Sequence, residues 1–247
     1  MKFEDMMDID LSNWKDFSHV HTKSAWFDKS DYHLSTKEYG SNKFHGRFHP
    51  EIPYQMMLRY TKKGEVVWDP FAGSGTTIDV AKLLERRCIA NDIVSTRHDI
   101  IPADSRIWKP DENVQLVIMH PPYWNMINFT DKSSDLSSTL TVESFANEFK
   151  KVVSNATDVL DNERILVLVI SDRYYKGEEI PLDFVCYNEI VKFGYKLKGR
   201  IVKNFGETKG GDSTGPQNKN LWRYRALKGG FWELGLDWIL VFQKGKK

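Results

Sequence analysis

The strongest constraint on the fold is a regular alternation of short apolar runs with segments of helical periodicity along residues 52–242. Short apolar runs predict buried strands, and apolar residues spaced three and four positions apart predict covering helices. The predicted strands are Glu65–Trp68, Cys88–Ile93, Val114–Met119, Ile165–Ile170, Tyr195–Phe205 and Trp238–Phe242. The predicted helices are Ile52–Arg59, Thr76–Arg86, Val142–Leu160 and Leu182–Val191. This order predicts an α/β fold with a mostly parallel sheet and helices on both faces.

Two regions fall outside this alternation. Residues 1–47 are polar and aromatic with little periodicity, which predicts an N-terminal arm preceding a main domain over residues 48–247. Residues 206–235 form a glycine-rich insert between the last two predicted strands. Long loops inside compact domains usually have a function or are disordered. A loop that merely covers the sheet edge is the structural alternative for this insert.

Composition narrows the class of protein. A chain of 247 residues suits one domain with a small annex. It has no run of about 18 apolar residues, so we expect no membrane span. The acidic N-terminus lacks the apolar stretch of a signal peptide, which favours a cytoplasmic protein. Cys88 and Cys186 are too few for a disulfide framework or a four-cysteine zinc site, and we predict no metal centre.

The net charge of +1 conceals an uneven distribution. Residues 192–247 contain 13 basic and 4 acidic side chains, a local charge of +9. Residues 1–191 contain the other 22 basic and 30 acidic side chains, a charge of −8. Such asymmetry indicates a polyanionic partner, although a solvated basic face would give the same count.

A glycine-rich turn follows the first predicted strand. The stretch from Asp69 to Thr77 reads DPFAGSGTT and leads into a predicted helix. Gly73 and Gly75 allow a ligand close to the backbone, and the helix start offers unpaired N–H groups. A dinucleotide site would need a third glycine where Ile78 stands, and a phosphate-binding loop would need a lysine. The turn therefore disfavours NAD and ATP as ligands.

DPFAGSGTT resembles the S-adenosylmethionine motif of the DNA amino-methyltransferases, which methylate adenine N6 or cytosine N4. The resemblance implies a Rossmann-like methyltransferase fold with a seven-stranded sheet, and S-adenosylmethionine as cofactor. It places Asp92 on the ribose hydroxyls, Ile93 on the adenine ring and Asp104 on the adenine amino group. It places the methionine part of the cofactor against His49, Pro50, Asp69, Phe71, Gly73, Gly75 and Thr76.

The second motif is His120-Pro121-Pro122-Tyr123, at the end of a predicted strand. Two prolines remove two backbone donors and keep the chain extended. The motif resembles the catalytic Asp/Asn/Ser-Pro-Pro-Tyr of the same family. There, the carbonyl at the position of Pro121 and the preceding side chain accept the hydrogens of an exocyclic amino group, which frees its lone pair. The position of Tyr123 supplies a stacking face for a flipped base.

Histidine at position 120 departs from the family pattern. A neutral imidazole accepts one hydrogen bond and a protonated one accepts none. With an ordinary pKa near 6.5, we expect activity to fall as the pH drops through that value. Acidic and amide residues at this position accompany mainly adenine and serine mainly cytosine, so histidine leaves the target base undecided. A cytosine-C5 enzyme is rejected, because neither cysteine follows a proline in the required setting.

The order of motifs, cofactor motif first, differs from the order usual for this wording of the turn and suggests a permuted or compact variant. The predicted partner is double-stranded DNA. A chain this short could share recognition with a second subunit, so a homodimer is one possible assembly, and a cognate restriction enzyme is a possible partner. The residues predicted to contact DNA are Arg200, Lys203, Lys209, Lys219, Trp222, Arg223, Arg225 and Lys228. Competing interpretations are an RNA guanine-N2 methyltransferase, a protein glutamine methyltransferase and a catalytically inactive DNA-binding module.

Overall fold

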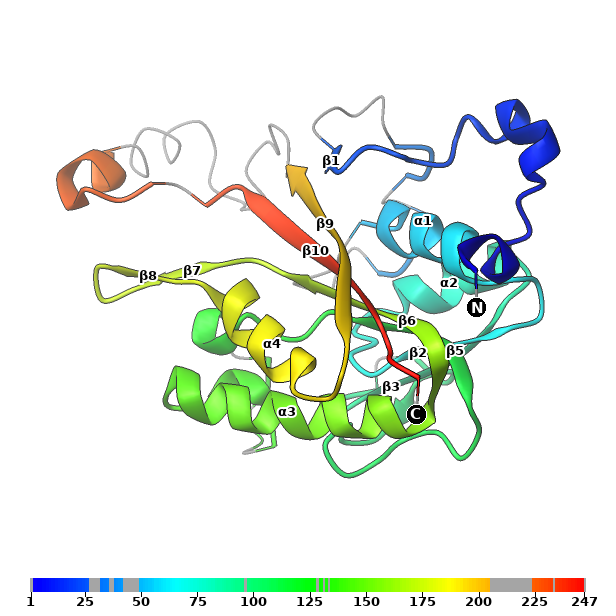
Figure 1. Cartoon of the computed structure of the whole chain (residues 1–247). Helices are drawn as coiled ribbons and strands as arrows, with labels where there is room; N and C mark the ends of the chain where they lie inside the picture. Colours follow the sequence, from blue (N-terminus) through cyan, green and yellow to red (C-terminus); the bar gives the residue numbers. More distant parts are fainter. Residues whose placement is uncertain are drawn as a thin grey trace.

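A central sheet organises the molecule in the computed structural model (Figure 1). The structure describes residues 2–26, 32–35, 38–41, 49–95, 97–127, 129–130, 132, 134–204, 224–232 and 234–246. These residues form an eight-stranded sheet in the order β1-β9-β10-β6-β5-β2-β3-β4. Its strands are β1 (Ala25–Trp26), β2 (Val66–Asp69), β3 (Arg87–Asp92), β4 (Ile101–Pro102), β5 (Val114–Met119), β6 (Leu160–Ile170), β9 (Lys196–Asn204) and β10 (Leu236–Gln243).

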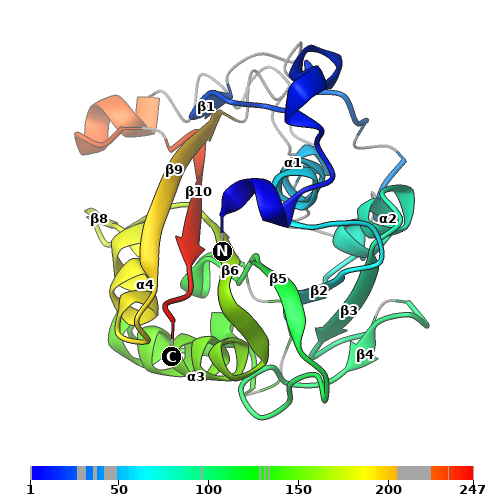
Figure 2. The ribbon, with the colours of Figure 1, turned by 45° about the vertical axis from the view of Figure 1, so that its right-hand side comes forward.

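Helices cover both faces of this sheet (Figure 2). The helices are α1 (Glu51–Tyr60), α2 (Thr76–Leu83), α3 (Val142–Val159) and α4 (Leu182–Val191). One buried cluster joins α3 and α4 to the sheet, and a second joins α1 and α2 to the opposite face. The prediction of a Rossmann-like fold with helices on both faces is therefore confirmed.

The central strands β5 and β6 show why apolar runs in the sequence predicted the sheet correctly. β5 and the second half of β6 are buried on both faces, so they read as continuous apolar runs rather than alternating ones. The long helix α3 starts at a capping box in which Thr141 accepts the Ser144 N–H at 3.0 Å. Its buried positions, from Phe145 to Val159, form one apolar stripe.

The strand β10 runs antiparallel to both of its neighbours, β6 and β9, whereas the other pairings in the described sheet are parallel. Its first residues therefore lie at the sheet edge where the parallel strands end. This brings the start of β10 beside the segments that follow β2, β3 and β5.

The sequence patterns missed the shortest elements. The arm contains the 3-10 helices η1 (Phe3–Met6) and η2 (Leu11–Phe17), and its β1 adds an eighth strand beside β9. The hairpin β7 (Arg173–Tyr175) and β8 (Glu178–Ile180) turns at Lys176 and Gly177, both at positive φ. Pieces of two or three residues are too short to show periodicity. Among the described residues, no helix has the length and apolar content needed to cross a lipid bilayer.

Candidate active site

The glycine-rich turn connects β2 to α2 at the carboxyl edge of the sheet. Gly73 (φ 50°) and Gly75 (φ 83°) have left-handed backbone conformations that other residues rarely adopt. A Cβ atom at Gly75 would also lie 2.6 Å from the guanidinium of Arg97. The Gly73 N–H donates to Asp92 Oδ2 at 2.9 Å, which ties the turn to the end of β3. The backbone conformation therefore favours glycine at both positions of this turn.

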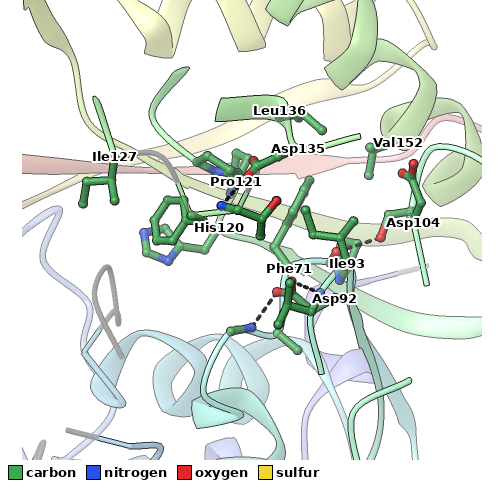
Figure 3. Close-up of a pocket in the computed structure, with 18 of the residues that line it drawn as sticks. Phe71, Asp92, Ile93, Asp104, His120, Pro121, Ile127, Asp135, Leu136 and Val152 are labelled. Carbon is green, nitrogen blue, oxygen red and sulfur yellow. Dashed lines mark hydrogen bonds between the residues drawn. The ribbon is translucent and has the colours of Figure 1, made fainter. Parts of the chain in front are cut away.

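A cavity of about 260 Å³ opens beside the turn, at the carboxyl ends of β2, β3 and β5 (Figure 3). This edge is the usual ligand site in open α/β sheets. Its lining includes the predicted cofactor residues Phe71, Gly73, Thr76, Asp92, Ile93 and Asp104. It also includes His120, Pro121, Pro122 and Tyr123. The structure thus brings the two sequence motifs to one cavity.

Four predicted cofactor residues do not line this cavity. Asp69 is 1% exposed behind the turn, where it accepts the Phe71 N–H at 3.0 Å. Burial raises the pKa of Asp69 to about 7, against the lowering effect of hydrogen bonds from Thr77 and Phe71. Gly75 is the residue before α2 and has a left-handed backbone conformation. These placements indicate a role in holding the turn rather than direct contact with a ligand.

His49 and Pro50 lie at the start of α1, away from the cavity. The His49 ring stacks on Tyr32 with ring centroids 4.3 Å apart, and its Nδ1 accepts the Glu51 N–H at 3.1 Å. The expectation that this pair contacts the methionine part of a cofactor is therefore not supported.

Two carboxylates in the cavity differ in their surroundings. Asp92 accepts the N–H groups of Gly73 and Val94, and burial raises its pKa despite these bonds. Asp104 forms a two-pronged ion pair with Arg106. Burial alone would raise the pKa of Asp104, but the Arg106 hydrogen bonds outweigh it and leave the pKa lowered. Asp104 is thus held ionised.

Two hydroxyl groups at the cavity wall fit a polar ligand. Ser74 and Thr76 are 3% and 1% exposed, and within the described part of the chain their hydroxyl oxygens have no hydrogen-bond partner. Buried hydroxyl groups in folded proteins usually have partners. Ser74 was missed by the sequence interpretation, although it lies between the two glycines of the turn.

The tetrapeptide follows β5 directly and contacts a distant strand. His120 Nε2 lies 2.8 Å from Tyr123 Oη, and the Tyr123 hydroxyl donates to Asp237 Oδ1 at 2.9 Å. Asp237, the second residue of β10, also lies 3.5 Å from the Lys203 ammonium. Asp237 lines the cavity and was not predicted as a site residue.

The environment of His120 changes the expected pH dependence. Burial, and secondarily the positive charge of Lys203, lower the pKa of His120 to about 3. The imidazole is therefore neutral throughout the range from about pH 5 to 8, above that pKa. The expected fall in activity near pH 6.5 no longer follows for this group, because the unperturbed pKa does not apply.

Four of the eight residues predicted to contact DNA are described by the structure, and they lie in different settings. Lys203 is 5% exposed and pairs with Asp237, so its assignment as a phosphate contact is corrected to a buried position at the cavity. Arg200 pairs with Asp183 and stacks 4.1 Å above the Trp238 ring. Arg225 and Lys228 are exposed on the helical turn 224–229. Lys209, Lys219, Trp222 and Arg223 lie outside the described residues.

One group away from the cavity has metal-ligand chemistry. Candidate ligand atoms of His21, His33 and Glu51 lie within 4.8 Å of one another. The Glu51 carboxylate already accepts the N–H groups of His33 and Leu34 and the side-chain amide of Gln55. These hydrogen bonds fasten the arm to α1, a role that needs no metal ion.

Comparisons with known proteins point to methyltransferases. Residues 3–102 match a family described as DNA methylase. The chain is 26% identical over 184 residues to the Type II methyltransferase M.MjaII of Methanocaldococcus jannaschii, an alignment covering 70% of this chain and 32% of the relative. The chain therefore spans about a third of the length of that curated relative.

Two solved structures share the fold. TrmN from Thermus thermophilus aligns with a TM-score of 0.51 and 16% identity, covering 81% of this chain and 50% of that one. YjhP from E. coli aligns with a TM-score of 0.50 and 13% identity, covering 82% and 96%. At these identities the alignments establish the architecture alone.

Proposed function

We propose that the chain is a DNA amino-methyltransferase that methylates an exocyclic amino group of a base in DNA, a proposal supported by the match of residues 3–102 to a family described as DNA methylase. The methyl donor is S-adenosylmethionine, and the acceptor is adenine N6 or cytosine N4. The observation that supports this proposal is the single cavity shared by the glycine-rich turn and the Pro-Pro-Tyr segment. A base paired inside a duplex cannot enter such a cavity, so the target nucleotide is flipped out.

The turn and the end of β3 form the cofactor half of the cavity. The hydroxyl groups of Ser74 and Thr76, at the start of α2, receive the methionine part. Asp92 accepts the ribose hydroxyls, since each carboxylate oxygen retains a lone pair beyond its bond to the backbone. Ile93 covers the adenine ring, and Asp104, oriented by Arg106, accepts from the adenine amino group.

The tetrapeptide forms the target half. The Pro121 carbonyl and the His120 ring accept the two hydrogens of the amino group, and Tyr123 stacks on the base. S-adenosylmethionine, when bound, would supply the methyl group: the freed nitrogen lone pair would bond to the methyl carbon while the carbon–sulfur bond breaks and S-adenosylhomocysteine leaves. One proton leaves the methylated nitrogen for water, because an imidazole with a pKa of about 3 is too weak a base to hold it. Catalysis here is positioning and hydrogen bonding.

The insert 206–235 and the helical turn within it are the proposed recognition surface. Arg225 and Lys228 supply exposed positive charge beside Tyr224, which is 58% exposed. Phosphate contacts need only such a local excess of charge. A homodimer would place a second copy of this surface on the DNA, and light scattering of the free protein and its DNA complex would test it. A cognate restriction enzyme would cut the same site when unmethylated.

The decisive experiment is a transfer assay with labelled S-adenosylmethionine and duplex DNA, RNA or protein as acceptors. We expect label in DNA, and nucleoside mass spectrometry should identify N6-methyladenine or N4-methylcytosine. Tyr123→Ala should lose transfer while still binding cofactor. Glu112→Gln is the matched control, because Glu112 forms an exposed ion pair with Arg87 away from the cavity.

Any other result of the transfer assay would support one of the alternative functions. Label only in RNA would identify an RNA amino-methyltransferase, and label only in protein a glutamine methyltransferase. Tight DNA binding without any transfer would leave a DNA-binding module.

A further inference from the structure

A chain of four side chains connects the tetrapeptide to the two strands at the far side of the sheet. His120 Nε2 contacts Tyr123 Oη at 2.8 Å, Tyr123 Oη contacts Asp237 Oδ1 at 2.9 Å, and Lys203 Nζ lies 3.5 Å from Asp237 Oδ2. Asp237 and Lys203 are 3% and 5% exposed. The contacts therefore occur out of bulk water, where they are stronger than at the surface.

The direction of each hydrogen bond follows from the donors available. An ammonium group only donates and a carboxylate only accepts, so an ionised Asp237 takes the single hydroxyl proton of Tyr123. The Tyr123 oxygen can then serve His120 only as an acceptor. The contact to His120 Nε2 is consequently an N–H donation, and the lone-pair nitrogen of the neutral ring is Nδ1.

We propose that Asp237, kept ionised by Lys203, is a positioning residue that acts through Tyr123 to hold His120 in its Nε2-protonated tautomer. This inference rests on the proposed function, in which the ring of His120 accepts a hydrogen from the target amino group. The tetrapeptide His120–Tyr123 contains no carboxylate. Asp237, two residues after the insert and 114 positions after Tyr123 in the sequence, supplies one at this site.

Lys203 is needed because Asp237 is so deeply buried. Burial raises the pKa of Asp237, and Lys203 is the largest influence that lowers it. The Lys203 ammonium, 3.5 Å from Asp237 Oδ2, is the counter-charge that favours the ionised carboxylate. If Asp237 were protonated, it would donate to Tyr123, Tyr123 would donate to His120 Nε2, and the imidazole proton would lie on Nδ1.

Strand register fixes this arrangement. Lys203 and Asp237 are directly paired residues of β9 and β10, and Trp26 of β1 pairs with Lys203 on the other side. Trp26 is 2% exposed. The N-terminal arm thus adds the strand next to Lys203 at this edge of the sheet.

The tautomer can be measured without any substrate. Nitrogen chemical shifts of ¹⁵N-histidine-labelled protein distinguish the protonated from the lone-pair nitrogen of each ring. The signals of His120 among the seven histidines are those missing from His120→Gln. We expect Nε2 to be protonated in the wild-type protein and the pattern to change in Asp237→Asn and Lys203→Met. Protonation at Nδ1 in the wild-type protein, or identical spectra in both variants, would overturn the proposal.

Kinetics test whether Asp237 acts through Tyr123. In single-turnover methyl transfer, Asp237→Asn should slow the reaction about 10- to 100-fold, because a small misplacement of a reacting group can cost on the order of 100-fold. Cofactor affinity should not change. In the Tyr123→Phe background the same substitution should cost almost nothing, because its route to His120 is already broken. Asp237→Glu should recover part of the rate.

Asp172→Asn is the matched control, because this acid bonds to the neighbouring Trp238 without touching the four-residue chain. Additive losses in the double variant, or an equal loss in Asp172→Asn, would show that Asp237 has a merely structural role. The proposed function and the positioning role of Asp237 can be refuted independently. A protein that methylates nothing but shows the expected tautomers refutes the function alone, and an active enzyme with unchanged tautomers refutes the positioning role.

Discussion

On the proposed cofactor side of the cavity, here called the cofactor wall, Gly73 bonds to Asp92, which lies 19 positions further along the chain. On the proposed target side, the target wall, Tyr123 bonds to Asp237, 114 positions away. The first wall consists of one strand–turn–helix unit and the end of the next strand. The second is assembled only when β9 and β10 take their places at the same sheet edge. The cofactor wall is therefore local in sequence, and the target wall depends on the completed sheet.

Truncation of Tyr123 should break the target wall while leaving the cofactor wall intact. Tyr123→Ala removes both the stacking face and the link between His120 and Asp237. Stacking alone contributes about 1–3 kcal/mol, so we expect methyl transfer to slow by roughly 100-fold or more. Calorimetric titration with S-adenosylmethionine should give an unchanged dissociation constant. A parallel loss of cofactor binding would mean that the two walls are not separable.

Asp92→Ala makes the reciprocal test on the cofactor side. It removes the acceptor of the Gly73 N–H and the proposed acceptor of the ribose hydroxyls. Hydrogen bonds to a charged group contribute about 1.5–3 kcal/mol, which predicts cofactor binding weakened by roughly 10- to 100-fold. DNA binding, followed by fluorescence anisotropy, should be retained. Unaltered cofactor affinity would remove Asp92 from the binding site.

The two walls should also respond to pH with opposite signs. The pKa of His120 is about 3 in the folded protein against an ordinary 6.5, so the unfolded chain binds the extra proton as pH falls from 6.5. This lowers the free energy of unfolding by up to about 2 kcal/mol at pH 5. Asp69, with a pKa of about 7, binds its proton in the folded state, so its contribution increases as pH falls below 7.

Urea unfolding at pH 5 and pH 7.5 would measure these contributions. Compared with the wild-type protein, His120→Asn should lose less stability at the lower pH, and Asp69→Asn should lose more. Equal pH dependence in all three proteins would contradict the buried, neutral state of His120.

The smallest effect is expected for the proposed recognition surface. Replacing Arg223 and Arg225 by alanine should weaken DNA binding by roughly tenfold and reduce the slope of log affinity against log salt by about 2. Cofactor affinity should stay the same, with Lys246→Ala as a control for loss of exposed charge elsewhere. A matching decline in cofactor affinity would indicate misfolding instead.

The same contrast explains what could be predicted from the sequence. β5 and α4 were predicted with the bounds that they have, because a doubly buried strand and a compact helix produce unmistakable apolar patterns. The turn from Phe71 to Thr76 was recognisable because its glycines and its cavity-lining residues are neighbours in the sequence. Helix α2 ends at Leu83, earlier than predicted, since Glu85 adopts a positive φ that apolar spacing does not reveal.

Lys203 and Asp237 show where such prediction fails. Along the sequence they look like surface charges of a basic C-terminal region, and charge counting assigned Lys203 to DNA. Only the antiparallel register of β9 and β10 buries them together beside Tyr123. Burial then lowers the pKa of His120 to about 3, whereas the residue type alone predicted an ordinary pKa near 6.5.

The antiparallel direction of β10 has a further consequence for how specificity can change. β9 ends and β10 begins at the same edge, with Leu236 held by the Ser171 hydroxyl through its carbonyl. The points where the chain leaves β9 and enters β10 therefore lie on the side of the sheet that holds the cavity. If the insert between them recognises DNA as proposed, its length and sequence could change without moving Asp237. New target sites could then be selected while the chemistry is inherited unchanged.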